Sequence, residues 1–201
     1  MKKLLFFSEL GRLLKSRLTW LVMLLVLVSP VAGLVWYKPA SAETMLSMYL
    51  ANPALAGGVA GGILFGLLTL YELERTGRSR VDVLVDAAVS PLTMAFLRLL
   101  SLLAVSVLTL ALTMLVWLPI CRGLTGAVFD MGDYVPAWLL FMGLALPLGI
   151  LAVSSAWQFT GRADLSLVLF AAFAGLSLTV WADNWQLCWH NPCVWALSDD
   201  F

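Results

Sequence analysis

Five apolar stretches, each long enough to cross a lipid bilayer, fill most of this 201-residue chain. Because a hydrocarbon core about 30 Å thick needs about 20 helical residues, each stretch is a candidate membrane span, the second and fifth being short ones. Hydrophobic residues make up 62% of the chain and charged residues 12%, more apolar surface than a soluble domain of this size can bury. The sequence therefore predicts an all-α, polytopic transmembrane bundle with spans at residues 18–36, 54–70, 94–120, 135–156 and 165–181.

The distribution of basic residues predicts the orientation of this bundle. If the N-terminus is cytoplasmic, all twelve lysines and arginines except Lys38 and Arg122 lie on or near the cytoplasmic side. That is the positive-inside distribution of membrane proteins. We therefore expect an N-in, C-out, multi-pass protein of the bacterial cytoplasmic membrane.

Tryptophans are expected at the headgroup level on both sides of the membrane, where indole rings are enriched. The outer ends of the predicted spans hold four of them and the inner ends two: Trp36, Trp117, Trp138 and Trp181 outside, and Trp20 and Trp157 inside.

Residues 2–17 have the pattern of a separate amphipathic helix. Apolar side chains recur there at spacings of three and four, and most of the remaining positions are polar or basic. Such a helix suits the inner membrane interface. The alternative is a charged leader that only orients the chain. The apolar positions are Phe6, Phe7, Leu10, Leu13 and Leu14.

The second span is rich in glycine and contains three overlapping Gly-x3-Gly pairs. Glycines at this spacing let another helix approach the backbone closely, and such packing drives helix association in lipid. The contact is either with another helix of this chain, which we favour, or with a second subunit or a moving wall of a pathway. The helix-packing glycines are Gly57, Gly58, Gly61, Gly62 and Gly66.

Residues 72–91 form the most polar inner segment. We expect a charged, glycine-containing break followed by a short amphipathic helix over residues 80–88, which Ser90-Pro91 ends. Val81, Leu84 and Val85 share one face of this helix. An outer loop is expected over residues 121–134, an inner turn over 158–164, and an outer segment over 183–201.

Cysteine and histidine offer little chemistry. Cys188 and Cys193 lie in the last outer segment and form either a disulfide, if that side is oxidising, or two free thiols. The chain has one histidine, His190, and we expect no metal site and no cofactor.

The order of these elements resembles that of the permease subunits of ABC-2-type exporters: an interfacial helix, a span, a glycine-rich span, a charged inner segment and a long third span. The family's inner loop runs from an acidic and a basic residue past a glycine and through an acidic-leucine helix to a proline-serine turn. The order Ser-Pro here departs from the family's Pro-x-Ser. The matching residues are Glu74, Arg75, Gly77, Asp82, Leu84, Ser90 and Pro91.

The resemblance implies that residues 72–91 are a coupling segment that docks into a cleft of a separate ABC ATP-binding subunit. Charged residues of the segment would complement that partner, and its apolar face would pack into it. The alternative is a solvated loop held at the lipid surface by its arginines. The implied docking residues are Glu74, Arg75, Gly77, Arg78, Arg80, Asp82, Leu84 and Val85.

The same resemblance implies a single permease domain over residues 1–201, paired with a second permease or with a copy of itself. The apolar composition of the spans suits a hydrophobic, amphiphilic or peptide cargo. Permeases of this family usually have six spans, and this chain ends where the segment before a sixth span would lie. We expect a truncated or half-length permease, or a genuinely short one.

An enzyme is not expected. The chain lacks the Gly-x4-Gly-Lys-Ser/Thr phosphate loop, so ATP would be hydrolysed by the partner. Ser177 with His190 could suggest an intramembrane protease, but a helix contact is the favoured interpretation of Ser177. The competing function is a structural or regulatory membrane subunit without a transport path. Besides lipid and protein we expect no nucleic-acid partner.

Overall fold

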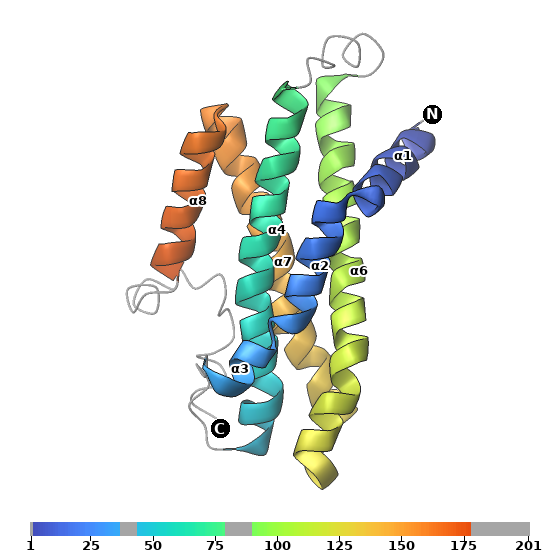
Figure 1. Ribbon diagram of the computed structural model, residues 1–201, viewed down its shortest axis with the longest axis vertical. Helices are drawn as coiled ribbons and strands as arrows, with labels where there is room; N and C mark the ends of the chain where they lie inside the picture. The colour runs from blue at the N-terminus through green and yellow to red at the C-terminus, as the bar shows by residue number, and fades with distance from the viewer. Residues whose placement is uncertain (1, 37–43, 79–89, 178–201) are drawn as a thin grey trace.

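The computed structural model describes residues 2–36, 44–78 and 90–177, and within these ranges it contains helices and no strand. The predicted all-α class is therefore confirmed. Most of the long helices run up and down along one direction (Figure 1). In chain order the elements are α1 (Lys2–Lys15), α2 (Arg17–Val28), α3 (Val31–Val35), the π-helical turn η1 (Ser47–Ala51), α4 (Asn52–Arg78), α6 (Pro91–Thr125), the 3-10 turn η2 (Gly126–Val128), α7 (Met131–Thr160) and α8 (Ala163–Ser177).

Four helical stretches are long and apolar enough to cross a bilayer, and they correspond to the first four predicted spans. The first is interrupted between α2 and α3, where Pro30 cannot donate a backbone hydrogen bond. The fifth predicted span corresponds to α8, which is apolar and has 15 residues. Residues 178–181 of that span lie outside the described part of the chain, as does the outer segment 183–201.

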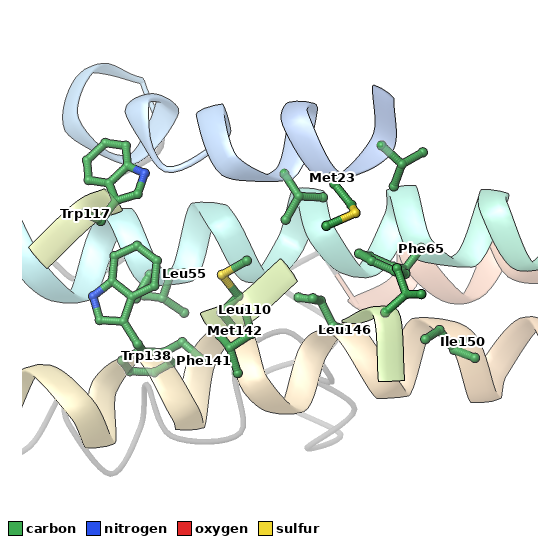
Figure 2. Packing of buried hydrophobic residues seen from close by; sticks show 14 of the residues in the cluster. Met23, Leu55, Phe65, Leu110, Trp117, Trp138, Phe141, Met142, Leu146 and Ile150 are labelled. Carbon is green, nitrogen blue, oxygen red and sulfur yellow. The ribbon is translucent and has the colours of Figure 1, made fainter. Parts of the chain in front are cut away.

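The core of the bundle lies where α4 packs along α7, with α2 and α6 covering this pair. Aliphatic, methionine and phenylalanine side chains from these helices meet there (Figure 2). Phe65 of α4, Met142 and Leu146 of α7, and Val26 of α2 are fully buried. Because lipid removes the hydrophobic drive for helix association, close packing of this kind supplies much of the cohesion between spans.

Two tryptophans predicted for the membrane interface instead lie inside the bundle. Trp117 is 3% exposed and Trp138 is completely buried, and their ring centroids lie 6.2 Å apart. The Trp117 indole nitrogen donates to the Leu27 carbonyl oxygen over 2.9 Å, so its polar atom is satisfied by α2 rather than by headgroups. Trp36 and Trp20, by contrast, are exposed, as the prediction required.

Two connections, those from α6 to α7 and from α7 to α8, are shorter than the sequence pattern predicted. The expected outer loop over residues 121–134 reduces to a short stretch, because α6 continues to Thr125 and Asp130 caps the start of α7 by accepting from the Gly132 amide over 3.0 Å. The expected inner turn over 158–164 reduces to Gly161 and Arg162. Gly161 adopts a φ of 61°, a left-handed conformation that glycine allows at a helix end.

Candidate functional site

The candidate site begins at the polar end of α4, where Glu72 lies in contact with α1. Its Oε2 accepts a hydrogen bond from Nη1 of Arg12 over 2.7 Å, although sixty residues separate the two in sequence. Nη2 of Arg12 also lies 2.9 Å from Oε2 of Glu9 on its own helix. Arg75, one turn beyond Glu72, approaches Oε1 of that carboxylate at 3.9 Å. These four charged side chains, here called the Arg12 cluster, join α1 to α4.

The charged side chains of the Arg12 cluster are partly or largely buried, and burial strengthens the interactions between them. The Glu72 side chain is 6% exposed and that of Arg12 30%. Burial lowers the pKa of Arg12, but the hydrogen bond and negative charge of Glu72, together with Glu9, outweigh that effect and leave this pKa raised. Arginine therefore stays charged at every ordinary pH, and a buried ion pair whose partner is removed leaves a costly uncompensated charge.

The α1 helix contributes more than charge to this site. Residues 2–17 were expected to form a helix, and α1 covers Lys2–Lys15 of them, ending where Ser16 breaks the helix before α2. Leu13 is 1% exposed and belongs to the bundle core, and α1 packs mainly against α6. Leu4 and Phe7 remain exposed, so α1 has one side on the protein and one side open.

The helix of the second span was expected to break at the start of the segment 72–91, and this prediction is wrong for residues 72–78. Residues 72–78, which include Glu74, Arg75, Gly77 and Arg78, continue α4 as helix. Glutamate, leucine and arginine are good helix formers, and the contact between Glu72 and Arg75 at a spacing of three supports the same turn. A single Gly77 costs about 1 kcal/mol relative to alanine and does not end the helix.

The rest of the expected docking segment falls outside the described residues. Arg80, Asp82, Leu84 and Val85, with the expected helix over 80–88, are in this part of the chain. The structure resumes at Ser90, which caps the start of α6 by accepting from the Thr93 amide over 3.4 Å, with Pro91 as the first helical residue. Ser90-Pro91 therefore starts the third span.

One end of the bundle collects the elements that the sequence places in the cytoplasm. In Figure 1 the upper end holds α1, the end of α4, the start of α6 and the turn between α7 and α8. α3, η1 and the connection between α6 and α7 lie toward the opposite end. The assignment of the upper end to the cytoplasm stays a prediction from the charge distribution.

The glycine-rich face of α4 lies against α7 of the same chain. A Cβ atom on Gly58 would lie 2.5 Å from the Phe141 carbonyl oxygen, and one on Gly149 of α7 would overlap the backbone of Gly62. These two approaches bring backbone against backbone, so no side chain can move aside to make room. The structure thus places this part of the glycine pattern at an intrachain contact.

The remaining glycines of α4 lie beside side chains. Gly57 faces Pro30, Gly61 faces Leu146, and Gly66 receives the ring of Phe170 from α8. Sequence reasoning missed the partner positions on α7 and α8, because nothing in the α4 pattern says which helix fills its glycine face.

Metal and thiol chemistry find little support in the described ranges. No group of three or more histidine, cysteine or acidic side chains is close enough there to hold a metal ion. Cys121 of α6 is a free, fully buried thiol. Cys188 and Cys193, with His190, lie outside the described residues, so their pairing stays a prediction.

Comparisons with protein-family models, with curated proteins and with solved structures found no match for this chain.

Proposed function

We propose that this chain is a membrane-spanning permease subunit of an ABC-2-type export system, and that a separate ATP-binding subunit docks on residues 72–91. The proposal rests on the sequence resemblance of that segment together with one observation. The segment begins inside a long apolar helix and ends at the cap of another, so whatever binds it is connected directly to two membrane-spanning helices.

The Arg12 cluster supports a mechanical role for this end of the bundle. A force applied to residues 72–91 acts on α4 directly. The ion pair of Arg12 with Glu72 transmits this force to α1. α1 in turn packs on α6, the helix at which the segment ends. The helices α1, α4 and α6 would therefore move as one unit when an ATP-binding subunit docked on the segment changes conformation.

The glycine contact between α4 and α7 supports the transmission of that force across the bundle. Backbones that touch without intervening side chains have little freedom to slide or deform independently. A displacement of α4 would therefore be shared with α7. In this proposal the path for the exported molecule opens between this rigid unit and a second permease or a second copy of the chain.

Co-purification tests the proposal. The tagged full chain is isolated from its own cells in a mild detergent, and co-purifying proteins that contain a phosphate loop are quantified. The double variant R78D/L84D places two acidic groups in the expected docking face. The matched control is R122D/V128D, which likewise replaces one arginine and one aliphatic residue by aspartate, at exposed positions near the opposite end of the bundle.

We expect the wild-type chain and the control to retain the same ATP-binding protein and R78D/L84D to retain at least about tenfold less, equivalent to about 1.4 kcal/mol of docking free energy. Equal retention by R78D/L84D, or no phosphate-loop protein with any of the three, would contradict docking and leave the structural-subunit function in its place.

A further inference from the structure

Helix α1 joins α2 at a break in the helical backbone. Ser16, the residue between the two helices, has φ −74° and ψ 126°, an extended conformation, and its side chain makes no capping hydrogen bond. No proline or glycine lies between Arg12 and Val28, and leucine, lysine and arginine are good helix formers. The local sequence therefore allows one continuous helix here, and the contacts that α1 makes with the rest of the fold hold it broken.

One buried hydroxyl group next to this break is left without a hydrogen bond. Thr19, in the first turn of α2, is 0% exposed, and its Oγ1 has no hydrogen-bond partner among the described residues. A buried hydroxyl without a partner is destabilising. The other buried serines and threonines of the described ranges each donate to a carbonyl oxygen three or four residues earlier. They are Ser47, Thr69, Ser101, Ser106, Thr109, Thr113, Thr125 and Ser166.

The break explains why Thr19 differs from these residues. In a continuous helix its hydroxyl would donate to the carbonyl oxygen of Lys15, four residues earlier, as the hydroxyl of Thr113 donates to that of Thr109 over 2.8 Å. The extended backbone at Ser16 ends α1 at Lys15 and removes this acceptor from the first turn of α2. Straightening the chain at Ser16 would therefore give Thr19 its missing partner.

Three contacts of α1 oppose such straightening. The indole nitrogen of Trp20 donates to the Leu14 carbonyl oxygen over 2.7 Å, whereas in a continuous helix that carbonyl accepts from the backbone amide four residues on. Arg12 is paired with Glu72 of α4, and Leu13 is 1% exposed in the bundle core. The broken and the continuous arrangement thus satisfy different groups, as the two states of a switching element do.

We propose that α1 is a hinged strap. It is closed on α4 and α6 in this structure, and it opens by straightening at Ser16 into a helix continuous with α2. Opening breaks the ion pair of Arg12 with Glu72, which frees the polar end of α4 and the part of α6 that α1 covers. While the strap is closed, α1, α4 and α6 remain one unit. The proposal does not rest on the transport function, because it concerns only contacts within this chain.

Cysteine labelling tests the hinge in the full chain, reconstituted in nanodiscs after replacement of its three native cysteines. Leu13→Cys places a thiol on the covered side of the strap, where a water-soluble maleimide reaches it only when the strap opens. Val22→Cys, at a buried position of α2, stays protected if only the strap moves. Each reporter is combined with Thr19→Val, which removes the unpartnered hydroxyl, and with Trp20→Phe. Thr113→Val is the matched control, because it removes a buried hydroxyl that has a partner.

We expect Thr19→Val to slow labelling at position 13 about tenfold, equivalent to about 1.4 kcal/mol in favour of the closed strap. Trp20→Phe should speed it about threefold, because it removes a contact of the closed strap alone. Since the two variants act in opposite directions, each tests the hinge independently of the other.

Thr113→Val should leave the rate at position 13 unchanged, and position 22 should stay unlabelled. The proposal is overturned if Thr19→Val folds and leaves the rate unchanged, if Thr113→Val slows labelling as much, if Trp20→Phe fails to speed it, or if position 22 is labelled as fast as position 13.

Discussion

The ion pair of Arg12 with Glu72 yields the sharpest energetic prediction. Replacing Arg12 by methionine keeps the length of the side chain and removes its charge, which leaves the Glu72 carboxylate without its shortest charged contact. Removing one partner of a fully buried pair costs about 3–5 kcal/mol. Because the Arg12 side chain is 30% exposed, solvent screens part of this, and we expect a loss of about 1–3 kcal/mol of unfolding free energy.

The double variant R12M/E72M separates the ion pair from simple loss of charge. Replacing both partners by apolar side chains of similar size removes the uncompensated charge, so its stability should lie within about 1 kcal/mol of the wild type and above that of either single variant. Glu9→Gln serves as the control for a more peripheral contact within α1, with an expected change of about 0.5 kcal/mol or less.

The assay is reversible unfolding of the purified chain in bicelles, by steric trapping or by added detergent, read through tryptophan fluorescence. The double-mutant cycle gives the coupling free energy directly. If the two single changes add within about 0.3 kcal/mol, the side chains do not interact and the link between α1 and α4 is refuted.

Three further predictions follow from the core. Gly58→Val drives a side chain into the α7 backbone and should lower stability by about 1–3 kcal/mol, whereas Gly123→Ala, at a site with no neighbour within 4 Å, should be neutral or stabilising in the same unfolding assay. Trp117→Phe removes the hydrogen bond to the Leu27 carbonyl and should cost about 1 kcal/mol, with loss of one buried emitter from the fluorescence spectrum. In a background without the other two cysteines, Cys121 should resist maleimide labelling until the protein is unfolded, because it is completely buried; rapid labelling of the folded chain would contradict its position.

Hydropathy predicted the positions of the helices well because it reports the solvent each segment requires. It predicted their ends poorly, since a helix does not stop where the lipid stops. The stretch from Glu72 to Arg78 is polar, yet it continues α4 through residues of good helix propensity. At the other end of the bundle, Asp130 caps α7 inside what was expected to be a loop.

The contacts between helices could not be predicted from the sequence pattern, for a different reason. The glycines of α4 predicted that another helix approaches α4 closely. They did not identify Gly149 of α7 as the contact, because the periodicity of a single sequence describes one helix at a time. Arg12 and Glu72 each look like ordinary interfacial charges until the fold brings them together. Trp117 and Trp138 have the spacing of headgroup anchors, and only their mutual packing shows that they belong to the interior.

We propose that an ATP-binding subunit holds the segment between α4 and α6 in the cytoplasm. A photoreactive amino acid placed at position 84 of the full chain in living cells tests this, with position 128 as the control at the opposite end. We predict an ATP-dependent adduct from position 84 to a protein with a phosphate loop and none from position 128. An adduct from position 84 to lipid alone, or labelling of that position by a membrane-impermeant reagent added outside the cell, would contradict the claim.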